Sequence, residues 1–106
     1  MQGYTETPDC WKFVKITPHD PAIPPHDRVL CSWYGGYLGN NSWKLSSGNL
    51  EVIDRGDYLE VPQHSGTVYH LYKAAERMSG MMMDIYAKTN KNAVDYKMET
   101  FDHVCQ

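Results

Sequence analysis

The residues best suited to chemistry lie in one stretch, 33–48, which combines large aromatic side chains with glycine and short polar residues. Trp and Tyr provide flat apolar rings with polar tips, a surface that stacks well on another ring. The intervening Gly residues let the backbone turn or approach a ligand closely. Asn and Ser add neutral hydrogen-bonding groups at turns. The stretch therefore predicts a binding site for a planar polar ligand, such as a nucleobase or a sugar.

Basic residues could extend this site toward an anion, because Arg offers a planar fork to phosphate and Lys a compact charge. A structural interpretation stays open, in which the tryptophans fill the core and the glycines build a wide turn. The predicted ligand-binding residues are Arg28, Trp33, Tyr34, Tyr37, Asn41, Ser42, Trp43, Lys44, Ser46, Ser47, Tyr69 and Arg77.

Catalytic patterns are missing from the sequence. The five histidines show none of the spacings that hold two metal ligands on one local frame. Cys31 falls inside a predicted strand, so we expect a small core residue rather than an exposed, activated thiol. Ser46 and Ser47 lack the G-x-S-x-G setting of an acyl-transfer nucleophile. We therefore predict no catalytic residue, no metal site and no cofactor.

Composition limits the class of protein. The 106 residues, with 42% hydrophobic and 22% charged side chains, indicate one ordered domain over 1–106. The formal charge of −3 and the scattered basic residues argue against duplex nucleic acid as a partner. The sequence has no long apolar run, so we expect neither a membrane span nor a secretory leader. Three cysteines, an odd number, indicate a reduced cytoplasm rather than a disulfide framework.

Alternating and β-branched segments must position the aromatic stretch. Residues 1–10 are expected to form a flexible lead-in. The Pro-rich stretch 18–27 is expected to form a loop. Gly56 supplies the positive φ that a hairpin turn needs. Strands are predicted at 11–17, 28–34, 43–45, 50–53, 58–61 and 67–72.

The period then changes. Apolar residues at three- and four-residue spacing predict one amphipathic helix over 74–89, with Gly80 as a weak point in its interior. Residues 90–106 form a C-terminal tail or a strand, since 94–100 alternates. The expected fold is α+β: a small antiparallel sheet of about five or six strands with one helix packed on it.

Three consecutive methionines on this helix, Met81, Met82 and Met83, cover more than one helix face. One interpretation is a loose core with one exposed Met. The other is a helix buried on two sides, by its own sheet and by a second subunit. The second interpretation predicts a homo-oligomer through this helix.

The segment W-Y-G-G-Y-L at 33–38, followed by N-S-W-K-L-S-S-G at 41–48, resembles small uncharacterised proteins of tailed bacteriophages. Tyr58 and the run S-G-T-V-Y at 65–69 are similar to the same group. The resemblance covers about residues 28–85. It implies a phage accessory protein acting in the host bacterial cytoplasm, and it carries no activity with it.

Three functions compete. The preferred one is a sponge that binds and sequesters a nucleotide-derived immune signal of the host. The alternative is a protein–protein inhibitor of a host defence enzyme, of the anti-CRISPR or anti-restriction type, although a charge of −3 is mild for a DNA mimic. The third is an enzyme that degrades a nucleotide.

Overall fold

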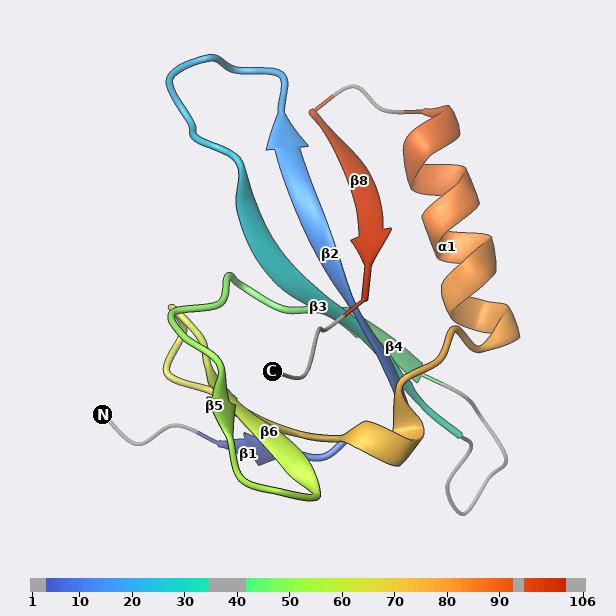
Figure 1. The fold of residues 1–106 in the computed structure, drawn as a ribbon. Helices are drawn as coiled ribbons and strands as arrows, with labels where there is room; N and C mark the ends of the chain where they lie inside the picture. Colours follow the sequence, from blue (N-terminus) through green and yellow to red (C-terminus); the bar gives the residue numbers. More distant parts are fainter. Residues whose placement is uncertain (1–3, 35–41, 93–94, 103–106) are drawn as a thin grey trace.

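The computed structural model describes residues 4–34, 42–92 and 95–102. Within these ranges the chain is α+β, as predicted, and most of its regular structure is strand (Figure 1). The strands are β1 (Thr5–Glu6), β2 (Cys10–Pro18), β3 (His26–Trp33), β4 (Ser42–Leu45), β5 (Ile53–Asp54), β6 (Tyr58–Pro62), β7 (Val68–Tyr72) and β8 (Tyr96–Phe101). The helices are a 3-10 turn, η1 (Lys73–Ala75), and α1 (Gly80–Lys91).

The strands belong to two sheets of four rather than to one sheet. The β6 sheet has the order β1-β7-β6-β5, and the β2 sheet has the order β4-β3-β2-β8. All pairings are antiparallel except that of β1 with β7. Figure 1 shows α1 beside β8, with the β6 sheet at the opposite side of β2 and β3.

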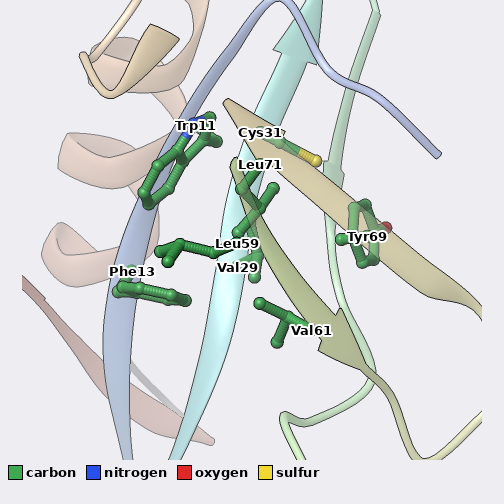
Figure 2. Packing of buried hydrophobic residues seen from close by; sticks show 8 residues of the cluster. All are labelled: Trp11, Phe13, Val29, Cys31, Leu59, Val61, Tyr69 and Leu71. Atoms are coloured by element: carbon green, nitrogen blue, oxygen red, sulfur yellow. The ribbon is translucent and has the colours of Figure 1, made fainter. Parts of the chain in front are cut away.

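Two apolar cores lie on opposite faces of the β2 sheet. The first joins it to the β6 sheet and contains Trp11, Phe13, Val29, Cys31, Leu59, Val61, Tyr69 and Leu71 (Figure 2). The second joins it to α1 and contains Cys10, Val14, Ile16, Leu30, Met82 and Met98. Both faces of β2 and β3 are therefore apolar, which explains why the sequence of β2 alternates imperfectly.

The helix begins six residues later than predicted. Ser79 caps it, because its hydroxyl accepts a hydrogen bond from the Met82 amide at 3.2 Å. Gly80 is thus the first residue of α1 rather than a weak point in its interior, and Ala74 belongs to η1. The predicted buried face is confirmed, since Met82 is buried and Met78 and Ile85 pack against the second core.

Three other segments differ from the prediction or sharpen it. The lead-in is not free along its length, because Thr5 and Glu6 pair with β7. Residues 50–52 are not strand, and Leu50 and Val52 are exposed. The ambiguous C-terminal segment does contain a strand, β8, which pairs with β2.

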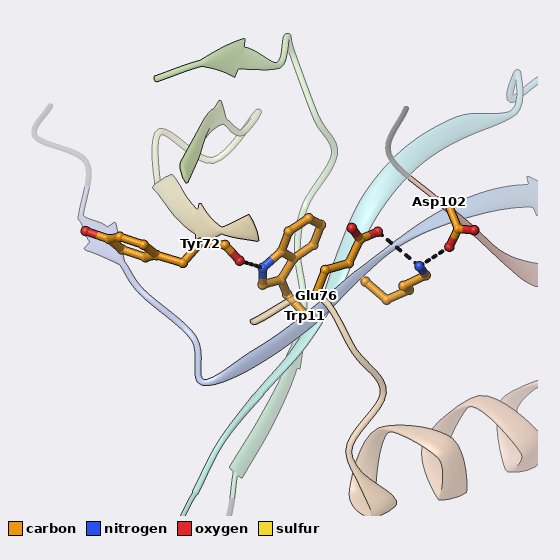
Figure 3. Close-up of polar contacts among 5 residues, drawn as sticks. Trp11, Tyr72, Glu76 and Asp102 are labelled. Carbon is orange, nitrogen blue, oxygen red and sulfur yellow. Dashed lines mark hydrogen bonds and ion pairs between the residues drawn. The ribbon is translucent and has the colours of Figure 1, made fainter. Parts of the chain in front are cut away.

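The connection from β7 to α1 is attached directly to β2. The Trp11 indole Nε1 donates a hydrogen bond to the Tyr72 carbonyl at 2.7 Å, and the Arg77 amide donates one to the Trp11 carbonyl at 3.0 Å. The Lys12 ammonium contacts the carboxylates of Glu76 and Asp102 (Figure 3). Burial lowers the pKa of Lys12, but these two acceptors outweigh it and hold the pKa above its ordinary value.

Ser79 has a second hydrogen bond, because its hydroxyl lies 2.8 Å from that of the buried Ser32 on β3. Ser79→Ala removes both the helix cap and this partner. We expect the free energy of unfolding to fall by about 1–2 kcal/mol. Urea denaturation followed by circular dichroism measures the change.

The matched control is Ser42→Ala, at an exposed position of β4. We expect it to stay within about 0.5 kcal/mol of the wild type. Equal losses in the two variants would contradict the assigned role of Ser79.

Candidate functional site

Four of the predicted ligand-binding residues line one surface hollow at the end of the β2 sheet. This edge hollow has a volume of about 420 Å³, and its lining residues are Glu6, Trp33, Ser42, Trp43 and Lys44. The β3–β4 pairing places Trp33 directly opposite Ser42, and Trp43 opposite Ser32. The volume lies in the range of sites for small molecules.

The two tryptophans differ in their surroundings. Trp33 is partly buried and packs against the core between the two sheets. Trp43 is 45% exposed on β4, where solvent reaches its ring. Trp33 thus combines a structural contact with a place in the edge hollow, whereas Trp43 has the surface a stacking ring needs.

Tyr34 and Arg77 form a separate group. The Tyr34 hydroxyl lies 3.0 Å from Cys10 Sγ, and Cys10 belongs to the core beneath α1. A hydrogen bond with Tyr34 raises the pKa of the Arg77 guanidinium. Since Trp33 packs against the other core, the two neighbouring aromatic residues lie on opposite sides of the β2 sheet. The sequence did not predict this division.

Arg28, Ser46 and Ser47 have structural partners. The buried Ser46 hydroxyl accepts a hydrogen bond from the Val29 amide at 2.7 Å, and the Ser47 hydroxyl accepts one from the Ser65 amide at 3.0 Å. Arg28 donates to the Ser46 carbonyl and to His26. None of the three lines the edge hollow, and their hydrogen bonds connect segments of the chain. Two other predicted site residues, Tyr37 and Asn41, lie outside the described residues.

Tyr69 is buried and does not line the edge hollow, but it is connected to it through strand pairing. Tyr69 is opposite Glu6 in the β1–β7 pair, and Cys31 is opposite Lys44 in the β3–β4 pair. Burial raises the pKa of the Cys31 thiol to about 12, against smaller opposing effects of its hydrogen bond with Tyr69 and the charge of Lys44. Burial likewise raises the pKa of the Tyr69 phenol. Both groups are therefore neutral at physiological pH.

Glu6 is the one described lining residue that the sequence did not predict. It lies on β1, within the stretch predicted to be a flexible lead-in, and its side chain is half-buried. Its charge raises the pKa values of both Cys31 and Tyr69, which places its carboxylate near them. No local signal marks it, because a two-residue strand has no readable period.

A second hollow of about 390 Å³ lies elsewhere on the β2 sheet and is lined by Lys15, Asp27, Glu99, Thr100 and Phe101. Lys15 is opposite Asp27 on β3 and opposite Glu99 on β8. None of the predicted ligand-binding residues lines this second hollow.

The described part of the chain contains no cluster of three or more His, Cys, Asp or Glu side chains that could hold a metal ion. Its two cysteines, Cys10 and Cys31, are free thiols and buried. A buried, protonated thiol is a poor nucleophile, so Cys31 offers no catalytic group to the edge hollow.

The raised pKa of Cys31 predicts a loss of stability at alkaline pH. The folded thiol keeps its proton, whereas the unfolded thiol loses it near 9.0. The contribution to stability is therefore complete below pH 9 and is lost as the pH rises toward 12. From pH 8 to pH 10 we expect the wild type to lose about 1.4 kcal/mol more than Cys31→Val, measured by urea denaturation.

An identical pH dependence in the two proteins would show that Cys31 ionises as easily in the folded chain as in the unfolded one. The folded protein would then not hold this thiol in its protonated form. The comparison ends at pH 10 because ionisation of the Tyr69 phenol, with an ordinary pKa of 10.0, contributes above that value.

In the described segments, no helix has the length and apolar character needed to cross a membrane. Comparisons with known protein families, with curated proteins and with solved structures gave no match for this chain. A function must therefore be inferred from the residues of the edge hollow and their surroundings.

Proposed function

We propose that this protein binds a nucleotide in the edge hollow and sequesters it without chemical change. The observation that carries the proposal is the meeting of Trp33, Trp43 and Lys44 around about 420 Å³ of space. An indole ring stacks on a base, and an ammonium group attracts a phosphate. A nucleotide has both groups at a short fixed separation.

Sequestration, rather than turnover, is supported by the chemistry around the hollow. The nearby thiol of Cys31 and phenol of Tyr69 are both held in their neutral forms. The lining residues offer one hydroxyl, one ammonium and one carboxylate. The hydrogen bonds found among the described residues join no base to the Ser42 hydroxyl, the pairing that would activate it as a nucleophile.

For the biological setting we rely on the resemblance to phage accessory proteins. We propose that the nucleotide is an immune signal of an infected bacterium and that the protein acts in the host cytoplasm as a sponge. An inhibitor that binds a host defence enzyme would carry no nucleotide. An enzyme that degrades the signal would carry or release a degradation product. Mass spectrometry of ligand released by heat from the purified protein separates the three: a sponge returns its ligand intact.

Trp43→Ala tests the stacking role. We expect affinity for a bound nucleotide to fall by about 1–3 kcal/mol, measured by isothermal titration calorimetry with guanosine and adenosine monophosphates. The domain should remain folded, because the Trp43 ring is already 45% exposed. An unchanged affinity would move the site away from β4.

The matched control is Trp11→Ala, which removes a fully buried indole. We expect it to cost about 3–5 kcal/mol of stability.

Lys44 provides an internal check on the nucleotide titrations. A phosphate contact makes the affinity fall with rising salt, and Lys44→Ala should remove part of that dependence. Salt-independent binding of these monophosphates would show that Lys44 does not contact the phosphate.

The methionine run supports a second part of the proposal, a homo-oligomer formed through α1. Met82 is buried in the core, whereas Met83 on the adjoining face is 54% exposed. A second copy would cover this apolar surface in a two-fold contact. We propose that α1 forms this contact, and the sponge function does not depend on it.

Met83→Lys is expected to shift the protein toward the monomer, because a charge in the contact loses its hydration. Light scattering over a range of concentrations measures the mass. Leu50→Lys is the matched control, since Leu50 is an equally exposed apolar residue on another element. A wild-type protein that stays monomeric at high concentration would exclude the contact.

A further inference from the structure

Resting on the proposed function, we infer that the edge hollow selects a guanine-type base, and that the Glu6 carboxylate is the group that makes the selection. Glu6 lies on β1 of the β6 sheet, whereas the other lining residues lie on β3 and β4 of the β2 sheet. The carboxylate thus comes to the edge hollow from a different sheet than the stacking and phosphate-binding groups.

The position of Glu6 is fixed by its strand. Glu6 pairs with Tyr69 in the parallel β1–β7 pair, and the Val68 amide donates a hydrogen bond of 2.7 Å to the Tyr4 carbonyl. The half-buried carboxylate takes part in none of the ion pairs found among the described residues. A partly desolvated carboxylate gains most from a ligand that donates hydrogen bonds to it.

The surroundings leave the Glu6 carboxylate as a hydrogen-bond acceptor for a ligand. Cys31 and Tyr69 are neutral, so the formal charges among the described lining residues and these two neighbours are those of Glu6 and Lys44. A phosphate placed next to Glu6 would be repelled. The phosphate of a nucleotide must therefore lie toward Lys44, which leaves the edge of its base to face Glu6.

Base edges differ in what they present to a carboxylate. An ionised carboxylate accepts hydrogen bonds and donates none. The Watson–Crick edge of guanine presents two adjacent donors, N1–H and the N2 amino group, which match the two oxygens. Adenine presents one amino group beside the acceptor N1, and cytosine presents one beside the acceptor N3. In both, one oxygen of Glu6 would face a lone pair.

The experiment compares three nucleotides that share a ribose and a phosphate. Calorimetric titration of the wild type with the monophosphates of guanosine, inosine and adenosine should give affinities in that order. Inosine keeps N1–H but lacks the N2 amino group, so we expect it to bind several-fold more weakly than guanosine. Adenosine monophosphate should bind at least about tenfold more weakly than guanosine monophosphate, because a charge-assisted hydrogen bond is replaced by a repulsive contact.

Glu6→Gln then tests the assigned residue. The substituted amide offers one donor and one acceptor, so affinity for guanosine monophosphate should fall about tenfold. Affinity for adenosine monophosphate should stay the same or rise. The matched control is Glu99→Gln, which removes a carboxylate from the second hollow and should leave all three affinities unchanged.

The outcomes separate this inference from the proposed function. If the three nucleotides bind equally well and Trp43→Ala weakens all of them, the nucleotide site stands and the selection by Glu6 is wrong. If none of them binds, the proposed function fails and the inference fails with it. The comparison of nucleotides on the wild type decides the base preference even if Glu6→Gln does not fold.

Discussion

The arrangement of the chain depends on Trp11. Its indole is fully buried between the two sheets and meets Phe13 edge-on, with ring centroids 5.2 Å apart. The same residue binds the outgoing chain twice, through its ring Nε1 to the Tyr72 carbonyl and through its own carbonyl to the Arg77 amide. One side chain thus supplies apolar area to the core and satisfies a backbone carbonyl where β7 ends.

This double role explains how a short chain holds three layers. The β2 sheet contributes alternate residues to two cores, so each strand of its centre is used on both faces. Fixing residues 72–77 against Trp11 brings the chain to the point where Ser79 can cap α1 and contact Ser32. The helix then covers the second face of a sheet whose first face is already occupied.

The sequence predicted most strands because β-branched and aromatic residues cluster in them. It predicted the turn at Gly56 because glycine adopts a positive φ without strain. It could not predict the division into two sheets, since pairing partners such as Thr5 and Val68 are far apart in the chain. The predicted start of the helix was wrong because Ala74 and Met78 continue the helical spacing of apolar residues although they precede the helix. The capping pair Ser79 and Gly80 was the stronger signal.

The predicted site residues lie together where they belong to one hairpin and are separated where they are only neighbours in the sequence. Trp33, Ser42 and Lys44 lie together because β3 pairs with β4. Tyr34 adjoins Trp33 yet reaches the other side, since successive residues of an extended chain point to opposite faces. Ser46 has the same composition signal as Ser42 but is used for a buried hydrogen bond with the Val29 amide. Residue type cannot distinguish these two uses.

The charges of the edge hollow restrict what it can bind more than its shape does. Lys44 and Glu6 contribute opposite charges to one small space, and the neighbouring thiol and phenol contribute none. A polyanion such as duplex DNA would meet the Glu6 carboxylate as well as the Lys44 ammonium, and the chain's net charge of −3 adds to that repulsion. A ligand with one anionic end and one neutral, hydrogen-donating end experiences both charges favourably. Because Glu6 comes from the β6 sheet and Lys44 from the β2 sheet, this match depends on the packing of Trp11 between the two sheets. The core therefore sets the separation of the Glu6 and Lys44 charges.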